Sequence, residues 1–506
     1  MLKLSVRKIL PFVVIFGVVL AFYYPALSTF FSQDDFFHIK ISQTDGSIKS
    51  FLGLFGFYPF EEKGIAFYRP VFRELLFNVF YSIFGLNPFP YRVLSFGIHF
   101  INIILVYCLI KRLFNKTAIS LFTAFFFSIS SANVATFYYF TGGIQILGAT
   151  MFMLLALILF WDYLKTNNKN RKKLALALSI LALGSHELSV VTPVLLSGMI
   201  FIFKPFKKTL RQIVKDLWPL GVLIIIYLWL EVNVIGFSKA EEQYQTVFSI
   251  KRTLNTLSWY YVWALGLPEM LIDFVFPGLK LNPSLIRYWG GYFKIIFPTF
   301  FVSTIIFLSS CFYLLSKHFS VLKNRRLVFL VVWFPLVMLP VLLLPLHKST
   351  YYLMPALTAF WGVVGFITLS AYSLFSKKCR MLGRFILGVL LVALFLLSGT
   401  SAVLGRTTYW AASRGKIAAG IIGQVKSLYP DIPKGSVFYF TNDPSYPFVA
   451  KDWGGTSKQA AFVLNGSDAL QLLYKDPTIQ VFYEDLGKPS FYIPPEKIYT
   501  LVARIR

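Results

Sequence analysis

The sequence is short of charged side chains and of cysteine. Only 14% of its 506 residues are charged, whereas 57% are hydrophobic. Soluble domains carry about a quarter charged residues, so this composition excludes an ordinary soluble globular protein and indicates many membrane spans. The cysteines Cys108, Cys311 and Cys379 lie within or at the inner ends of apolar runs, which is not the pattern of a disulfide framework.

Acidic residues are scarce as well, with 22 Asp and Glu against 49 Lys and Arg and a formal net charge of +27. The basic residues stand in short clusters between apolar runs, which is typical of cytoplasmic loops. We therefore expect membrane lipids, and no nucleic acid, among the partners. No solenoid repeat, glycine-rich phosphate loop, nucleophile elbow or metal-spaced Cys/His cluster is present. No metal ligands and no cofactor are predicted, although a divalent cation is compatible with the sequence.

The apolar runs predict an all-α polytopic membrane domain over residues 1–404, with about eleven transmembrane helices. The expected spans are residues 9–30, 91–110, 117–133, 142–162, 174–186, 188–203, 217–235, 292–315, 327–346, 352–375 and 385–404. Because Lys and Arg mark the cytoplasmic side, the N-terminus is expected in the cytoplasm. Two long outer loops, 31–90 and 236–290, follow from this topology, and residues 254–276 are apolar enough to be re-entrant or spanning.

Residues 405–506 have a different character. Turn residues precede a strand-like run at 437–440, and a helix from about Ser467 to Tyr474 precedes a second strand-like run at 479–483. This pattern predicts a small extracytoplasmic α/β domain. The absence of eukaryotic appendages favours a bacterial plasma membrane as the location.

An acidic pair, Asp34 and Asp35, directly follows the first predicted span. A charge so close to the bilayer is costly, so it requires a partner or a function. One interpretation is a helix cap, with Ser32 as N-cap and the acids in the first turn, where the helix dipole favours them. The other is a general base at the membrane surface, with the lipid as source of the second substrate.

Further polar residues recur at the outer ends of predicted spans. They are His38, Tyr68, Arg69, Arg73, His186, Glu187, His347, Lys348 and Tyr351. Each alone has an ordinary explanation, such as an interfacial cation or a hairpin tip. Together, carboxylates and cations on one face can form a single site. Sugar transfer from a polyprenyl phosphate needs these residue types, because a carboxylate takes the acceptor proton and cations hold the leaving phosphate.

Several of these residues carry a family resemblance. The motifs Gln33-Asp34-Asp35, Tyr68-Arg69-Pro70 and Gly85-Leu86-Asn87-Pro88, with His99, resemble the GT-C superfamily of membrane glycosyltransferases. The resemblance is to bacterial relatives of the tetratricopeptide-containing transmembrane O-mannosyltransferases, without the repeats, and covers about residues 1–375. The segments 185–187 and 347–355 resemble later motifs of that group. They depart from it because His186 stands where Lys is usual, and His347-Lys348 replaces an Arg.

The resemblance implies an inverting transfer from a polyprenyl-phosphate-linked sugar donor to a hydroxyl of a lipid, glycan or protein acceptor. It implies that Asp34 or Asp35 is the general base. The residues expected to bind the donor phosphate or the substrate are Tyr68, Arg69, Arg73, His186, Glu187, His347, Lys348 and Tyr351.

Two alternatives stay open at this point. An O-antigen ligase or polymerase also has many spans and large outer loops, but such sites depend on Arg and His without an acidic pair after the first span. A lipid or sugar transporter or flippase is the alternative from a different class. That class typically has ionisable residues near the middle of the bilayer and a repeat between its halves, and the sequence displays neither.

Overall fold

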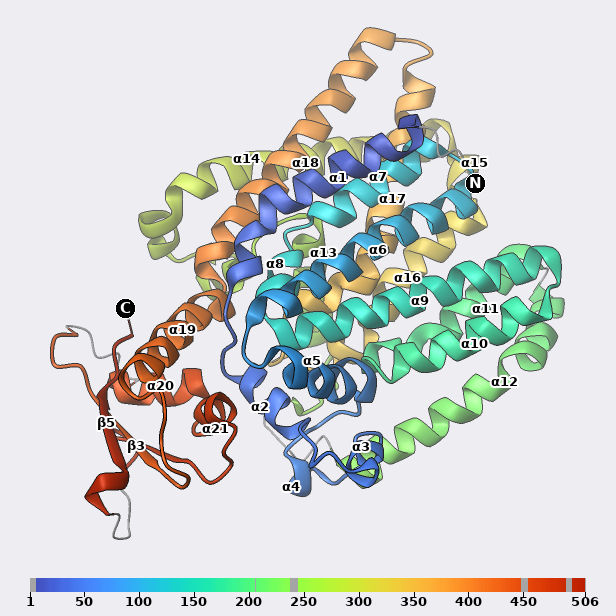
Figure 1. Cartoon of the computed structure of the whole chain (residues 1–506). Coiled ribbons are helices and arrows are strands. Elements are labelled where there is room, and N and C mark those ends of the chain that lie inside the picture. Colours follow the sequence, from blue (N-terminus) through green and yellow to red (C-terminus); the bar gives the residue numbers. More distant parts are fainter. Residues whose placement is uncertain (1–5, 205, 237–243, 447–453, 488–493, 506) are drawn as a thin grey trace.

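The computed structural model describes residues 6–204, 206–236, 244–446, 454–487 and 494–505. Its helices form one elongated bundle, and a small domain containing a sheet is attached at one end (Figure 1). Helix α1 begins at the end of the bundle that lies away from this small domain (Figure 1). The fold is therefore that of an integral membrane protein with a small C-terminal α/β domain, as the sequence predicts.

Each predicted span overlaps a helix, but the helix at 174–186 is not among the described segments that are apolar enough to count as candidate spans. The helices of the bundle are α1 (Val6–Tyr23) with η1 (Tyr24–Ser28), α6 (Pro88–Phe114), α7 (Thr117–Ile129), α8 (Asn133–Tyr138), α9 (Phe140–Thr166), α10 (Lys169–Leu183), η3 (Glu187–Val191) with α11 (Thr192–Phe203), α12 (Phe206–Leu230) with η4 (Glu231–Ile235), α14 (Pro283–Lys317), α15 (Phe319–Leu322), α16 (Arg325–Leu342), η8 (Thr350–Leu353) with α17 (Met354–Phe375), and α18 (Arg380–Thr408). Among the described residues, eight helical segments are long and apolar enough to cross a membrane. Segments 117–129 and 187–203 are apolar but shorter.

The loop of residues 31–90, which the sequence places on the outer side, is a chain of short helices. These are α2 (Asp34–Ile41), α3 (Ile48–Gly53), α4 (Phe60–Lys63), the π-helical η2 (Pro70–Leu75) and α5 (Leu76–Phe84). Val79 and Ile83 of α5 are exposed, whereas the Asn78 side chain turns inward and donates a hydrogen bond to the Ser42 carbonyl over 2.9 Å. An apolar outer face of this kind suits a helix that lies in the membrane surface.

The second long predicted loop, residues 236–290, contains no long span in its described part up to the start of α14. Residues 254–276 form the end of α13 (Ile250–Leu265), the short helix η7 (Glu269–Phe274) and the start of a small hairpin, β1 (Val275–Phe276) and β2 (Lys280–Leu281). The aromatic residues of this segment therefore lie in α13, in η7 and in the hairpin, and none of them lies in a long span. Residues 237–243 of the loop lie outside the described part.

The C-terminal domain combines a three-stranded parallel sheet with helices. The sheet has the order β4 (Gln480–Tyr483), β3 (Val437–Thr441), β5 (Ile498–Val502), and the helices are α19 (Trp410–Leu428), α20 (Thr456–Leu464) and α21 (Asp468–Tyr474). The predicted strands at 437–440 and 479–483 and the helix at 467–474 are confirmed. Helix α18 continues past residue 404 to Thr408, so the polypeptide enters this domain as helix.

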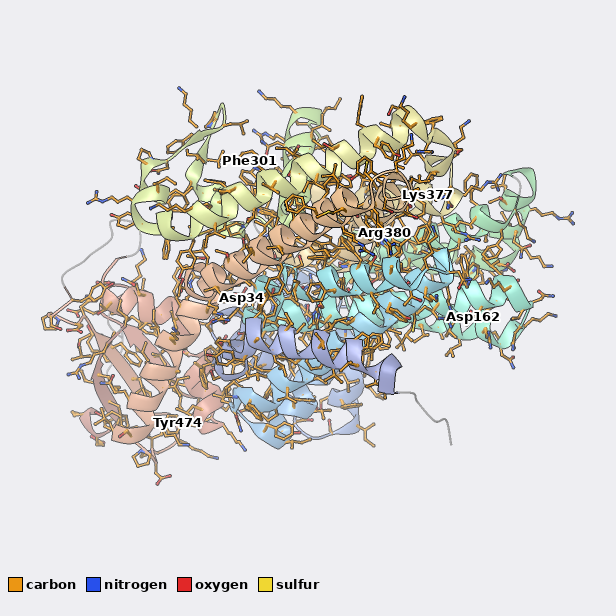
Figure 2. The ribbon with its side chains drawn as sticks, turned by 90° about the horizontal axis from the view of Figure 1, so that it is seen from above. Asp34, Asp162, Phe301, Lys377, Arg380 and Tyr474 are labelled. Atoms are coloured by element: carbon orange, nitrogen blue, oxygen red, sulfur yellow. The ribbon has the colours of Figure 1, made fainter. Side chains whose placement is uncertain are left out.

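Hydrogen bonds and an ion pair join this domain to the loop of residues 31–90. The Gln33 backbone N–H donates to the Val463 carbonyl over 2.8 Å, and the Lys40 ammonium lies 2.6 Å from the Asp468 carboxylate. The Tyr81 hydroxyl donates to the Leu472 carbonyl. Helix α2 is thus held against the domain, and Asp34 lies near this junction, whereas Lys377 and Arg380 lie toward the other end of the bundle (Figure 2).

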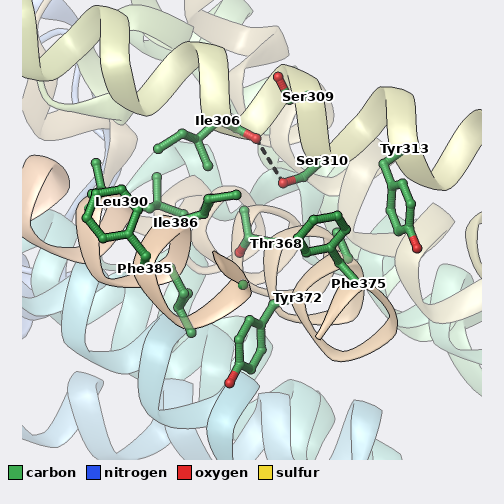
Figure 3. A pocket seen from close by; sticks show the side chains of 14 residues that line it. Ile306, Ser309, Ser310, Tyr313, Thr368, Tyr372, Phe375, Phe385, Ile386 and Leu390 are labelled. Carbon is green, nitrogen blue, oxygen red and sulfur yellow. Dashed lines mark hydrogen bonds between the residues drawn. The ribbon is translucent and has the colours of Figure 1, made fainter. Parts of the chain in front are cut away.

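A cavity of about 430 Å³ between α14, α17 and α18 is mostly apolar, and its polar side chains carry hydroxyl groups only (Figure 3). Ile306, Phe375 and Leu390 are among the side chains that line it. Such a surface suits contact with hydrocarbon chains and offers no set of groups for polar chemistry. The predicted polar residues lie instead toward the junction with the C-terminal domain.

Candidate active site

The two acidic residues of the pair have different environments. Helix α2 begins at Asp34 and its N-cap is Gln33, with a φ of 50°, so the expectation that Ser32 caps the helix is wrong. Asp35 is 1% exposed, and its carboxylate accepts hydrogen bonds from the Ser32 N–H (3.2 Å), the Thr141 N–H (2.9 Å) and the Thr141 hydroxyl (2.7 Å). Asp35 therefore ties the start of α2 to the start of α9.

A buried arginine completes this connection. Arg92 of α6 donates to backbone carbonyls on two segments, at 3.1 Å to Thr29 and 2.7 Å to Phe137. Burial raises the pKa of Asp35, and the Arg92 charge opposes that rise. The three hydrogen bonds and the nearby cation give Asp35 the surroundings of a structural carboxylate.

Asp34 is half-buried and faces a different set of groups. Its Oδ2 accepts a hydrogen bond from the Tyr139 hydroxyl over 3.0 Å. The Tyr139 ring lies 5.1 Å from that of Trp410, the first residue of α19. Arg414, one turn further along α19, stacks over Trp410 at 4.9 Å and interacts electrostatically with Asp34. The Arg414 guanidinium also donates a hydrogen bond to the side chain of Gln33. The carboxylate thus lies where α2, α9 and the C-terminal domain meet.

A buried ion pair between Arg69 and Glu187 forms the centre of a second group of residues. Arg69 binds Glu187 with both prongs of its guanidinium, Nε to Oε2 at 2.7 Å and Nη2 to Oε1 at 2.6 Å. Its third nitrogen, Nη1, donates to the Gln145 amide oxygen at 2.6 Å. Burial alone would lower the pKa of Arg69, but the paired carboxylate raises it above its ordinary value. The structure thus brings together two predicted residues that are 118 positions apart.

His38 connects the two groups. It lies one turn after Asp34 on α2, and such a spacing places both side chains on one face of a helix. Burial, and then the charges of Arg73 and Arg69, hold the pKa of His38 well below its ordinary value. Arg73 itself is buried and donates to the Glu74 carboxylate at 2.7 Å. Its Nε has no hydrogen-bond partner in the described part of the chain.

Two further predicted residues, His186 and Tyr351, lie near the Arg69–Glu187 ion pair. The His186 ring is buried, and its Nδ1 accepts from the Leu188 N–H, so the ring carries any proton on Nε2. That Nε2 has no hydrogen-bond partner among the described residues. Tyr351 connects this region to Asp34, because its ring lies 6.5 Å from that of His186 and 5.9 Å from that of Tyr139.

His347 lies on the same side, with its ring 5.7 Å from that of Tyr352. Burial, with the Arg69 charge as a smaller cause, lowers the pKa of His347 to about 4. The imidazole is therefore neutral at pH 7. It can donate or accept a hydrogen bond there. It does not supply the positive charge of the arginine that stands at this place in the resembled group.

Two predicted residues point elsewhere. The Tyr68 hydroxyl donates to the Phe55 carbonyl over 2.9 Å, and its ring stacks on Phe57 at 3.8 Å. Lys348 lines a separate cavity together with Glu269. Neither side chain has a direct contact with Arg69 among the described interactions.

Sequence reasoning missed several members of the site. Glu231 and Gln145 lie in apolar stretches, where a polar side chain indicates a specific partner, so their position was a usable signal. The buried Glu231 accepts from the Tyr68 N–H over 2.9 Å. Tyr139 and Trp410 gave no such signal, because 18% of the residues are aromatic. Within the described ranges, no group of three or more His, Cys, Asp or Glu side chains is arranged to hold a metal ion.

The fold and this site define a class: a polytopic membrane protein with a mixed acid and cation cluster at the junction of its helices and a C-terminal domain. Residues 68–232 match the family model of the dolichyl-phosphate-mannose-protein mannosyltransferases. This match covers about a third of the chain and includes Arg69, Gln145, Glu187 and Glu231. It confirms the resemblance to the GT-C superfamily that the sequence motifs predicted.

Two solved structures are similar in fold to the chain. The archaeal oligosaccharyltransferase AglB from Archaeoglobus fulgidus, in complex with an inhibitory peptide and a dolichol-phosphate, has a TM-score of 0.49 and 12% identity, with 92% of this chain and 64% of that chain covered. The apo form of the Archaeoglobus fulgidus oligosaccharyltransferase has a TM-score of 0.46 and 13% identity, with coverages of 87% and 63%. The chain thus spans less than two thirds of the length of either protein. A search of curated proteins found no match.

Proposed function

We propose that the protein is a membrane glycosyltransferase that moves a sugar from a polyprenyl-phosphate-linked donor to an acceptor hydroxyl on the outer face of the membrane. The observation that carries the proposal is the half-buried Asp34 carboxylate, which the rings of Tyr139 and Tyr351 connect to the buried Arg69–Glu187 ion pair. The family-model match supports the donor class, because the matching family is described by a dolichyl-phosphate-mannose donor and a protein acceptor.

In the proposed reaction Asp34 is the general base. The acceptor oxygen forms a bond to the anomeric carbon while its proton passes to the Asp34 carboxylate. The bond between the anomeric carbon and the phosphate oxygen breaks, and its electron pair leaves with the lipid phosphate. A single displacement of this kind inverts the anomeric carbon. The Tyr139 hydroxyl, which donates to Oδ2, orients the carboxylate toward the acceptor.

Arg69 is the proposed cation for the leaving phosphate. A guanidinium carries five N–H groups, and the bonds to Glu187 and Gln145 use one on each nitrogen. Two N–H groups therefore remain to donate to phosphate oxygens, and Glu187 keeps the plane of the fork fixed. His186 and His347 then contribute N–H donors, and Tyr351 positions the Arg69 cluster relative to Asp34. Tyr68 and Arg73 act as positioning residues for the same segment.

The proposed orientation sets the N-terminus in the cytoplasm and the C-terminal domain outside a bacterial plasma membrane. Its support is the Lys and Arg asymmetry of the loops, since basic residues mark the cytoplasmic side. Lys377 and Arg380 lie toward the end of the bundle away from Asp34, in agreement with this orientation (Figure 2). The donor then reaches Asp34 laterally, from the outer leaflet.

The test is a transfer assay with the purified protein in lipid nanodiscs. The donor is a polyprenyl-phosphate hexose labelled in the lipid, and separate lipid, glycan and protein fractions of a bacterial envelope serve as acceptors. We expect release of free polyprenyl phosphate only with one of the fractions, and no release from the Asp34→Asn protein. Transport of the intact lipid without release would identify a flippase instead. Equal release by wild type and Asp34→Asn would contradict the proposed base.

A further inference from the structure

A small cavity lies next to the candidate active site. It has a volume of about 210 Å³ and is bounded by η7, the segment before η8, the end of α18 and the start of α19. Trp410 forms part of its wall, and the ring of Trp410 also contacts Tyr139, whose hydroxyl binds Asp34. Trp410 therefore borders this cavity and also contacts the tyrosine that binds the proposed base.

Two buried serine hydroxyls in the wall of this cavity are unsatisfied. Ser131 is 6% exposed and Ser401 is 1% exposed, and neither Oγ has a hydrogen-bond partner in the described part of the chain. Leaving a buried hydroxyl without a partner is unfavourable, so such groups require an explanation. Here the two residues come from segments 270 positions apart in the numbering and line the same space. Their convergence indicates a polar ligand that supplies the missing hydrogen bonds.

Charged groups line the same cavity. Glu269 accepts from the Thr350 N–H at 2.7 Å, and burial raises the pKa of its carboxyl. Lys348 and Asp273 also contribute to the wall. Although it shares the cavity with two carboxylates, Lys348 forms no ion pair within the described ranges. The cation and the carboxylates therefore face a common space without neutralising one another directly.

We propose that this cavity binds the sugar ring of the donor. Hydroxyl groups of the sugar would pair with Ser131, Ser401 and the Glu269 carboxylate, Trp410 would cover one face of the ring, and Lys348 would lie beside the donor phosphate. The volume is below the range of about 300–1,000 Å³ that is typical of drug-sized ligands, which suits a single ring and excludes a lipid chain. This inference rests on the proposed glycosyl transfer.

Two serines of α18 provide a matched comparison. Ser398 is fully buried, and its Oγ also has no partner among the described residues, but it does not line the cavity. Ser401→Ala and Ser398→Ala remove the same atom from the same helix, three residues apart. Only the first change should affect a ligand in the cavity. Ser401→Leu, which fills the space, serves as a second variant.

The experiment measures binding to the full-length protein in nanodiscs. The probes are polyprenyl-phosphate mannose, glucose, galactose and N-acetylglucosamine, and polyprenyl phosphate without sugar. Ser401→Ala should weaken binding of the preferred sugar lipid roughly twofold to tenfold, the value of one hydrogen bond. Ser401→Leu should weaken it by about tenfold or more. Neither variant should change binding of the bare lipid phosphate, and Ser398→Ala should change neither probe. A melting curve for each variant verifies folding.

Each of the other outcomes contradicts either this inference alone or the proposed function as well. If both Ser401 variants bind the sugar lipid as wild type does, the cavity holds water only and the inference fails, while the proposed transfer stands. Equal weakening for sugar lipid and bare lipid phosphate also overturns it, because the effect then does not depend on the sugar. A wild-type protein that binds none of the sugar lipids contradicts the proposed function itself, and the inference with it.

Discussion

Replacing Asp34 by Asn should abolish most turnover and leave the fold intact. The Tyr139 hydroxyl can donate to an amide oxygen as well as to a carboxylate, so the contact that holds this side chain survives. An amide cannot accept the proton of the attacking hydroxyl. Loss of general-base catalysis typically lowers a rate by about a hundredfold to ten-thousandfold. Donor binding and thermal stability should stay close to those of the wild type.

The neighbouring change, Asp35→Asn, should act on stability. The Asp35 carboxylate accepts three hydrogen bonds from Ser32 and Thr141 with its two oxygens, whereas Asn offers a single oxygen. The amide NH₂ then faces at least one buried N–H, and an unpaired donor of this kind costs about 1–3 kcal/mol. The same change removes the negative charge near the buried Arg92. We expect a lower melting temperature, and a loss of activity that follows the loss of folded protein.

Both variants are measured by single-turnover transfer at saturating lipid donor, with a melting curve for each. Asp45→Asn is the matched control, because it makes the same change at an exposed position of the same loop. The reasoning is refuted if Asp34→Asn folds normally and transfers at the wild-type rate. An Asp35→Asn protein that melts with the wild type would show that Asp35 does not clamp the loop.

Three further predictions concern the membrane orientation, the Arg69–Glu187 ion pair and the pH dependence of stability. A cysteine in place of the exposed Ser47 should react with an impermeant reagent in intact cells. A cysteine in place of the exposed Asn168 should react only after the cells are permeabilised. The reverse pattern would contradict the proposed orientation. Arg69→Ala should lose donor binding and about 3–5 kcal/mol of stability, because it leaves the Glu187 charge unpaired. The Arg69→Ala/Glu187→Ala double variant should regain stability without regaining donor binding. Wild-type kinetics toward the donor in Arg69→Ala would remove this residue from the site. His347 has a folded pKa of about 4 against 6.5 in the unfolded chain, so the unfolded state takes up a proton first and stability should fall as the pH drops from 6.5 toward 4. His347→Gln should reduce that fall in melting curves between pH 7 and pH 5, and an unchanged pH profile would contradict the assignment.

Local sequence patterns determined much of the architecture. Apolar runs of sufficient length identified the helices of the bundle, because a membrane span requires a continuous stretch of apolar residues. Alternation and turn residues identified strands β3 and β4 of the small sheet. The motifs around Asp34 and Arg69 indicated a resemblance to the GT-C superfamily, and residues 68–232 match the family model of the dolichyl-phosphate-mannose-protein mannosyltransferases. Each of these signals lies within a short segment, where it can be read without knowledge of the packing.

Only the tertiary structure decided which polar groups meet. Asp34 and Asp35 are adjacent in sequence, yet the start of α9 contacts Asp35 through Thr141 and Asp34 through Tyr139, and this difference separates the two carboxylates. The partner of Arg69 is 118 residues away, and Trp410 belongs to a helix that begins after the last span. Such contacts depend on how distant segments pack against one another, because a side chain's partners are set by burial and geometry in three dimensions. Local periodicity records only the face on which each side chain lies.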